Sequence, residues 1–231
     1  MELTVVLPCF NEVENIEHTI QDVHSWFQKA GIDGEIIVVD DGSTDGTGEL
    51  AEKLSKKMPA LVVVHHKKNR GVGAAQSTGC DHGTKKYVSY MDSDGQFRAQ
   101  EFDLLLPMLT EHRMAAGYRI KRADPPLRSL NAWLYGRLVR VVLGVKKRDI
   151  NCGLVVMERD LWPLVKPRFA TGGLFPAEMY ASAKRLGVEI AQVGVPHYPR
   201  SAGKQSGASP LVIFRMFKEL CALKKALRKQ G

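Results

Sequence analysis

The pattern of hydrophobic and polar positions divides the first half of the chain into regularly alternating segments. Short runs rich in β-branched residues recur four times, and each is followed by a stretch with helical periodicity. The runs are LTVVLP, EIIVVD, LVVVHH and KYVSYMD, and the helical stretches cover 12–29, 46–57, 72–82 and 100–112. This alternation predicts βαβ units, hence an α/β fold with a mostly parallel central sheet flanked by helices.

The second half of the chain is less regular and richer in cationic and proline residues from about residue 113. Its pattern predicts a basic amphipathic helix over 128–143, a strand near 151–156, a helix over 176–186 and a strand over 188–195. The last segment, 210–229, has apolar residues at helical spacing with Lys and Arg between them. We therefore expect the chain to end in a second basic amphipathic helix.

Composition favours one large domain and an anionic partner. The chain has 231 residues, of which 44% are hydrophobic, enough for one well-buried core. Its net charge of +8 favours nucleic acid, a phosphorylated substrate or an acidic lipid. Aromatic residues make up 7% and do not interleave with the basic clusters, which argues against a nucleic-acid-binding module.

Cysteine usage and hydropathy suggest a reduced, cytoplasmic compartment. The four cysteines are far apart and form no CxxC pair: Cys9, Cys80, Cys152 and Cys221. We expect no signal peptide, because no basic region and apolar run open the chain. No apolar run approaches the roughly 18 to 20 residues of a spanning helix. Any contact with a membrane is therefore expected at its surface.

Polar and glycine-rich segments follow all four predicted strands of the first half. They read PCFNE, DDGSTDGT, HHKKNRGVGAA and DSDGQ in chain order. In an open parallel sheet, ligands bind outside the carboxyl ends of the strands. The chemistry of this protein is therefore expected along one edge of the sheet.

Asp92 and Asp94 are separated by a single serine at the end of the fourth predicted strand. Two carboxylates so close together repel each other unless a cation lies between them. Mg²⁺ or Mn²⁺ suits such a site, because these ions take one or two protein carboxylates and complete their coordination with phosphate oxygens and water. The alternative is an exposed turn rich in Asp, Ser and Gly.

The second and third segments also have two interpretations. Asp45 and Thr47 are explained by the cap of the following helix. Asp40 and Asp41 are better explained as acceptors for N–H groups or ribose hydroxyls of a nucleotide.

Gly71 precedes a helix N-terminus, where the backbone can approach a phosphate or sugar. Neither G-x-G-x-x-G nor a Walker P-loop is present, which removes the main support for dinucleotide binding and ATP hydrolysis.

Together the four segments resemble, in order and spacing, the motifs of family 2 inverting glycosyltransferases, which have the GT-A fold. VVLPCFNE is similar to the family's P-x-Y-N-E with Phe10 for the tyrosine, VVDDGSTDGT to D-D-G-S-x-D-x-T, NRGVGAA to N-x-G-x-x-x-A and DSDGQ to D-x-D. The D-x-D-x-Q of Asp92, Asp94 and Gln96 resembles the polyprenyl-phosphate branch, which includes dolichyl-phosphate mannose synthase. AGYRIKR, RDINCGLVVMER and HYPRSAGKQSG resemble later motifs of that branch.

Three departures from that branch concern the second half. Gln205 and Ser206 stand where its last motif has serine and lysine, Leu154 and Val155 replace aromatic and basic residues, and we expect none of the C-terminal transmembrane helices that many relatives have. These departures leave the sugar and the acceptor open but not the reaction class.

The resemblance implies a GT-A domain over 1–209, with a nucleotide-sugar-binding half at 1–112 and an acceptor-binding half at 113–209, followed by the helix in 210–231. It implies a nucleotide-sugar site made of Pro8, Asn11, Glu12, Asp40, Asp41, Gly71 and Asp92, and a metal site made of Asp92, Asp94 and Gln96. The implied catalytic residues are Asp94, Arg119, Arg200 and Glu178. The implied contacts to the acceptor phosphate are Arg119, Arg122, Arg128, Arg200 and Lys204.

Several of these residues have a structural alternative. Arg122 and Arg128 are equally well explained as solvated surface charges. Glu178 suits a general base only for a hydroxyl acceptor, and an ordinary first-turn carboxylate after Pro176 explains it slightly better. The histidines lack the spacing of a metal pair, so structural roles, or a phosphate contact by His197, are expected for His65, His66 and His197.

The implied function is metal-dependent transfer of a sugar, mannose or glucose, from a GDP- or UDP-sugar to a polyprenyl phosphate such as dolichyl or undecaprenyl phosphate. The alternative within the same family is a saccharide or other hydroxyl acceptor. The helices over 128–143 and 210–229 are expected to lie on the cytosolic face of an anionic membrane. Their alternatives are packing against the core, or contact with another subunit or a membrane protein.

Overall fold

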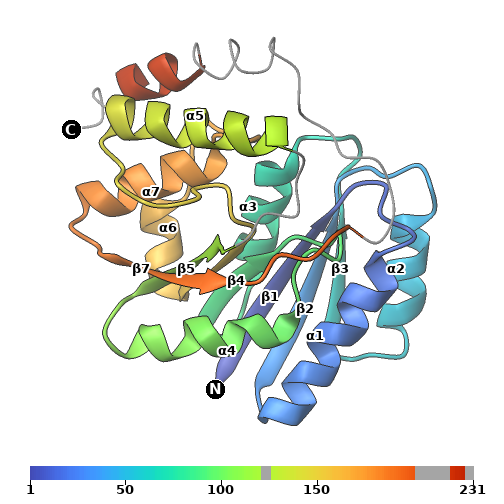
Figure 1. Ribbon diagram of the computed structural model, residues 1–231. Coiled ribbons are helices and arrows are strands. Elements are labelled where there is room, and N and C mark those ends of the chain that lie inside the picture. The colour runs from blue at the N-terminus through green and yellow to red at the C-terminus, as the bar shows by residue number, and fades with distance from the viewer. Residues whose placement is uncertain (121–125, 201–218, 227–231) are drawn as a thin grey trace.

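The computed structural model describes residues 1–120, 126–200 and 219–226. At its centre is a seven-stranded sheet in the order β3-β2-β1-β4-β6-β5-β7 (Figure 1). The strands are β1 Glu2–Cys9, β2 Asp33–Asp40, β3 Leu61–His65, β4 Tyr87–Met91, β5 Met114–Arg119, β6 Leu154–Glu158 and β7 Ile190–Val195. All pairings are parallel except those of β6, which runs antiparallel to β4 and β5. The predicted mostly parallel α/β sheet is confirmed.

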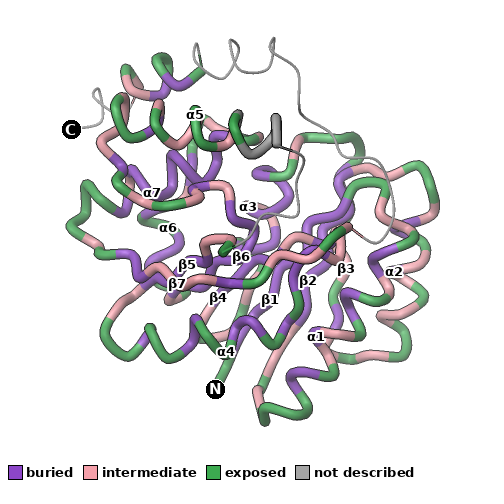
Figure 2. Tube along the Cα trace, in the orientation of Figure 1, coloured by how far each residue is buried: buried purple, intermediate pink, exposed green. Residues whose placement is uncertain are grey.

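Helices cover both faces of the sheet, and each face has its own core (Figures 1 and 2). In β1, Leu3, Val5 and Leu7 pack with α1 Ile16–Ala30, α2 Thr47–Ser55 and α4 Phe102–Leu105. Val6 points to the opposite face, which is covered by α3 Val72–His82, α5 Pro126–Leu143, α6 Trp162–Val165 and α7 Phe175–Arg185. This alternation along one strand is the two-residue period expected of a strand buried on both faces.

Strand β5 is the element that the hydrophobic pattern did not predict. After Met114 its residues are small or polar, so the segment MAAGYR carries little hydrophobic signal. The strand forms because it pairs with β6 on one side and β7 on the other. A Cβ at Gly117 would lie 2.9 Å from Val195 Cγ2, so this strand needs a small residue there. Packing between two neighbours thus overrides weak local propensity.

Two other predictions of local structure are corrected. The helix expected over 100–112 is broken into the 3₁₀ turn Ala99–Glu101, the short helix α4 and the 3₁₀ turn Leu106–Thr110. Pro107 opens the last turn, and proline has no N–H to continue an α-helix. The strand near 151–156 begins only at Leu154, because the Cys152 N–H donates to the Asp149 carbonyl in a turn.

Most of the helix predicted over 210–229 lies outside the described residues, and its described part, 219–226, is helical. Leu220 and Leu223 are buried in the same core as Val139 of α5. These two leucines therefore pack against the domain, as the core-packing alternative predicted, rather than against a bilayer. No helix among the described residues is long and apolar enough to cross a membrane.

Candidate active site

The four parallel strands β3, β2, β1 and β4 end side by side, and the loops that follow them meet at one edge of the sheet (Figure 1). The first two loops are joined by hydrogen bonds: the Asn11 N–H donates to Ser43 Oγ over 2.9 Å, and the Glu12 N–H donates to Thr47 Oγ1 over 2.9 Å. Asn11 has a φ of 55°, a left-handed conformation that asparagine tolerates. These bonds fix the backbone that carries the Glu12 side chain.

Asp45 supports this loop junction rather than a ligand. Its carboxylate accepts hydrogen bonds from Thr47 and from the Val13 N–H. Burial opposes the charged form, but these hydrogen bonds outweigh it and lower the pKa of Asp45. Asp45 and Thr47 therefore have a local structural role, but the N-cap position of α2 is Gly46, which has no side-chain cap hydrogen bond.

Asp40 and Asp41 already have partners within the protein. Asp41 is 2% exposed, and its carboxylate accepts from His66 Nδ1 over 2.6 Å and from the Arg70 and Gly71 N–H groups. Asp40 accepts from the Ser43 N–H over 3.0 Å and lies 3.1 Å from His65 Nδ1. Asp41 therefore shapes the loop after β3, while Asp40 is tied to β3 itself.

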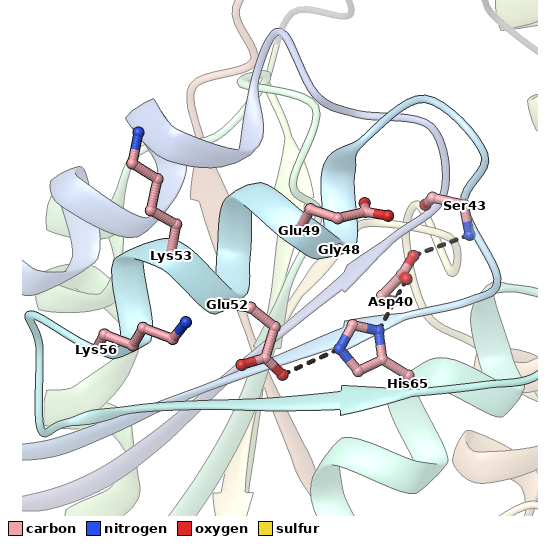
Figure 3. A pocket seen from close by; sticks show the side chains of 8 residues that line it. All are labelled: Asp40, Ser43, Gly48, Glu49, Glu52, Lys53, Lys56 and His65. Atoms are coloured by element: carbon pink, nitrogen blue, oxygen red, sulfur yellow. Dashed lines mark hydrogen bonds and ion pairs between the residues drawn. The ribbon is translucent and has the colours of Figure 1, made fainter.

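A surface pocket of about 400 Å³ lies beside Asp40, between α2 and β3 (Figure 3). His65 bridges Asp40 and Glu52 across it, with 3.1 Å to each carboxylate. Burial opposes protonation of His65, but the hydrogen bonds to Asp40 and Glu52 raise its pKa above 6.5. The lining residues are Asp40, Ser43, Gly48, Glu49, Glu52, Lys53, Lys56 and His65, so the pocket lies next to the sheet edge and not over Asp92 or Asp94.

Gly71 is positioned by Asp41 for a close approach of two backbones. Its φ of 96° favours glycine, and a Cβ would lie 2.7 Å from the Thr171 carbonyl oxygen. That same carbonyl accepts a hydrogen bond from the Ala74 N–H at the start of α3. The loop before α7 thus closes over the end of α3 that was predicted to approach a phosphate or sugar.

Asp92 lies against Gly153, the residue immediately before β6. The Asp92 N–H donates to the Gly153 carbonyl over 3.0 Å. A Cβ on Gly153 would lie 2.0 Å from Asp92 Oδ2, so any larger residue would displace this carboxylate or the backbone beside it. The residue immediately before β6, which no local pattern relates to Asp92, therefore supplies the space, or cradle, for its carboxylate.

Asp94 and Gln96 have different partners in the same loop. The Gln96 N–H donates to Asp94 Oδ1 over 3.1 Å, and Asp94 Oδ2 lies 3.4 Å from the guanidinium of Arg200. The Gln96 side chain is buried and donates to the Tyr198 carbonyl over 3.1 Å. Gln96 thus connects this loop to the chain after β7, and its predicted role as a metal ligand stays a prediction.

The two arginines at this edge are held in different ways. Arg119 donates through Nε and Nη2 to the two oxygens of Asp149, 2.6 Å each, and the pair is largely buried. Burial opposes the charge of Arg119, but Asp149 and, more weakly, Asp92 raise its pKa. Arg200 instead spans two loops, with ion pairs to Glu12 and Asp94.

Asp92 and Asp94 fit a divalent cation that also binds phosphate. No group of three or more His, Cys, Asp or Glu side chains suited to a metal occurs among the described residues. Mg²⁺ and Mn²⁺ need no such group, because one or two carboxylates hold them when phosphate oxygens and water complete the shell. The cradle at Gly153 shows that space is kept for the Asp92 carboxylate.

The family model for glycosyl transferase family 2 matches residues 4–160. The chain belongs to this family. The structure of mannosyl-3-phosphoglycerate synthase from Rubrobacter xylanophilus is similar, with a TM-score of 0.75 at 21% identity, covering 100% of this chain and 75% of that one. Glucosyl-3-phosphoglycerate synthase from Mycobacterium tuberculosis, solved with Mn²⁺, UDP-glucose and phosphoglyceric acid, has a TM-score of 0.73 at 22% identity, covering 96% and 79%. The predicted family and GT-A fold are confirmed.

Relatives with curated names act on polyprenyl phosphates, according to those names. Polyprenol monophosphomannose synthase of Mycolicibacterium smegmatis is 30% identical, covering 89% of this chain and 81% of the relative. Dodecaprenyl-phosphate galacturonate synthase of Rhizobium johnstonii is 27% identical, covering 96% and 65%. Dolichyl-phosphate beta-glucosyltransferase ALG5C of Trichomonas vaginalis is 27% identical, covering 83% and 62%. The chain therefore spans somewhat less than two thirds of the length of the last two.

In this family 2 protein, Glu178 has a structural environment. Its side chain is buried at the start of α7, and its carboxylate accepts hydrogen bonds from three consecutive backbone N–H groups, those of Arg168, Phe169 and Ala170. It thereby holds the loop that closes over Gly71. The structural interpretation of Glu178, which the sequence slightly favoured, agrees with these contacts.

The remaining predicted residues are only partly described. Pro8 lies in β1, where its carbonyl accepts from Ser93 Oγ. Arg122, Lys204 and the side chain of Arg128 lie outside the described residues. Sequence reasoning missed Asp149 and Gly153 as site residues, although both lie within the motif RDINCGLVVMER. The signal available in the sequence was that motif itself. In the structure, Asp149 also has a left-handed φ of 36°.

Proposed function

We propose that this protein transfers a sugar from a nucleoside diphosphate sugar to a polyprenyl phosphate, with Mg²⁺ or Mn²⁺ held by Asp92 and Asp94. The observation that carries the proposal is the sheet edge that joins this carboxylate pair to two arginines, Arg119 and Arg200. Carboxylates suit the cation and arginines suit phosphates. The names of three curated relatives support a polyprenyl-phosphate acceptor.

The roles of individual side chains follow from their positions. The divalent ion, when bound, supplies charge that stabilises the departing nucleoside diphosphate. Glu12 and Asp94 present carboxylates from two neighbouring loops, and Arg200 lies between them. Arg119 is committed to Asp149, so we assign it an electrostatic contribution near Asp92 rather than a two-pronged contact with phosphate.

A lipid phosphate acceptor agrees with the environment of Glu178. An ionised phosphate is already a nucleophile, so its attack depends on positioning and charge stabilisation more than on a base. A hydroxyl acceptor needs a base, and the candidate residue Glu178 is buried with both oxygens accepting backbone N–H groups. This favours the phosphate acceptor over the saccharide or other hydroxyl alternative.

We place this work at the cytosolic face of a membrane, and the outer surface of α5 supports contact with a membrane surface. Four large apolar side chains are exposed there at helical spacing, Leu130, Trp133, Leu134 and Val141. The guanidinium of Arg137 lies 5.2 Å from the Trp133 ring, on the same stripe. An apolar stripe with arginine and tryptophan suits the headgroup zone of an anionic bilayer.

For the donor, we propose mannose or glucose as the sugar and GDP or UDP as the leaving group.

The test is transfer of radiolabelled sugar from a panel of GDP- and UDP-sugars into organic-extractable polyprenyl phosphate, with Mg²⁺, Mn²⁺ or EDTA. We expect cation-dependent label in the lipid, and a loss of about 100-fold or more in Asp94→Asn, the scale of removing one electrostatic stabiliser of a transition state. Asp160→Asn is the matched control, since its carboxylate is exposed and pairs with Arg113 beyond the end of β6, away from Asp92 and Asp94. Label that enters only water-soluble saccharides, in an Asp94-dependent way, would replace the lipid by a hydroxyl acceptor.

A further inference from the structure

Arg200 occupies a position between two carboxylates that belong to different loops. Its guanidinium forms ion pairs with Glu12, after β1, and with Asp94, after β4. Glu12 is also held by Asn15, whose Nδ2 donates to it over 2.7 Å. All three charged side chains are mostly but not fully buried, with 12% to 18% of each exposed. The site thus contains a protein cation next to one of its proposed metal ligands.

The contact between Arg200 and Asp94 is suited to exchange. Its length of 3.4 Å exceeds the usual range of an N–H···O hydrogen bond, so it is a weak bond. Arg119 provides the contrast, because its two bonds of 2.6 Å to Asp149 are short and parallel and the pair is more deeply buried. Arg119 is therefore fixed by Asp149, whereas Arg200 is only weakly bonded to Asp94, the carboxylate that is proposed to bind the cation.

The segment that carries Arg200 is attached to the same loop as Asp94. The Tyr198 N–H donates to the Gln96 carbonyl over 3.1 Å, and the Gln96 side chain donates back to the Tyr198 carbonyl over 3.1 Å. The guanidinium of Arg98 lies 4.8 Å from the Tyr198 ring. These contacts keep the Arg200 backbone near Asp94 while its long side chain can change partner.

We propose that Arg200 is a resident counter-cation that competes with the divalent metal for Asp94 until the donor diphosphate arrives. In the donor-free protein, Arg200 neutralises Asp94 and Glu12, which disfavours binding of the metal alone. The diphosphate gives the guanidinium a new anionic partner, and the metal then takes Asp94. Metal and nucleotide should therefore bind with positive cooperativity that depends on Arg200. This inference rests on the proposed function, because it assumes that Asp94 is a metal ligand.

The experiment measures Mn²⁺ binding by the loss of the free-ion signal in electron paramagnetic resonance, with no nucleotide and with UDP or GDP. Wild type should bind Mn²⁺ weakly alone and more tightly with one of the nucleotides. Arg200→Gln should bind Mn²⁺ alone about tenfold or more tightly than wild type, the scale of one hydrogen bond to a charged group. In that variant, the gain in Mn²⁺ affinity on adding nucleotide should shrink.

Two further variants make the result decisive. Arg200→Lys keeps the charge, so its Mn²⁺ affinity should stay close to wild type, and it remains informative if Arg200→Gln does not fold. Arg113→Gln removes an arginine that pairs with Glu158 and Asp160 away from the sheet edge, and it should match wild type. If Arg200→Gln bound Mn²⁺ no more tightly than wild type, and kept the wild-type cooperativity between Mn²⁺ and nucleotide, this inference would be overturned and the proposed function would not be affected. Mn²⁺ binding that is unchanged in Asp94→Asn would overturn the proposed metal site and the inference with it.

Discussion

Gly153→Ala is the most specific perturbation of the site that the structure offers. The new Cβ would lie 2.0 Å from Asp92 Oδ2 and 2.1 Å from its Cγ. Ordinary van der Waals contact begins near 3.4 Å, so the carboxylate or the β6 backbone must move by about 1.4 Å. Overpacking of this kind costs about 1–3 kcal/mol of stability. A displacement of about 1 Å in a positioned group lowers turnover by about 100-fold.

We therefore expect Gly153→Ala to remain folded, to bind Mn²⁺ more weakly in the presence of nucleotide, and to lose most of its sugar transfer. Thermal unfolding, Mn²⁺ titration and the lipid-labelling assay measure the three quantities on one preparation. Gly136→Ala is the matched control, because among the described residues no atom outside the neighbouring backbone of its own helix lies within 4 Å of its added Cβ, and alanine is the better helix former. Wild-type Mn²⁺ affinity and transfer in Gly153→Ala would refute the cradle as the determinant of the Asp92 position.

Two further predictions concern pH and the membrane. Burial, only partly opposed by Arg98, raises the pKa of Glu101 from 4.5 to about 7, so the stability that its protonated form contributes is complete below pH 4.5 and is lost as the pH rises through 7. Glu101→Gln should therefore be more stable than wild type at pH 8, with a higher melting temperature and a free energy of unfolding larger by up to about 3 kcal/mol. Equal melting curves for the two proteins from pH 5 to 8 would contradict this prediction. Trp133→Ser should weaken sedimentation with anionic vesicles more than Leu164→Ser, a change at an equally exposed apolar residue on α6; equal losses would assign no special role to the α5 stripe.

Some features of this protein could be predicted from the sequence because they are local. The first three strand-helix alternations, the polar residues after each strand and the hydrogen bonds between Asp45 and Thr47 are all properties of neighbouring residues. Hydrophobic period and turn chemistry encode them directly. Parallel strands then bring their carboxyl ends together, which is why one edge of the sheet could be predicted as the site.

Other features depended on contacts between distant segments. Strand β5 has a weak pattern of its own and exists because β6 and β7 pair with it. The partners of Arg119 and Arg200 lie 30 and 106 or more residues away, so no spacing relates them. Long-range ion pairs and close packing are set by the tertiary fold rather than by the chemistry of adjacent residues.

The sequence by itself determined which residue types follow the predicted strands, namely carboxylates, amides and glycines, and these are the predicted site residues. Only the tertiary structure decided what each of them contacts. In the structure, the carboxylates of Asp41 and Glu178 accept hydrogen bonds from backbone N–H groups. Arg119 pairs with Asp149, and Arg200 pairs with Glu12 and Asp94. The physical reason is that a buried charge must be paired or hydrogen-bonded, and the fold brings together the groups that do so.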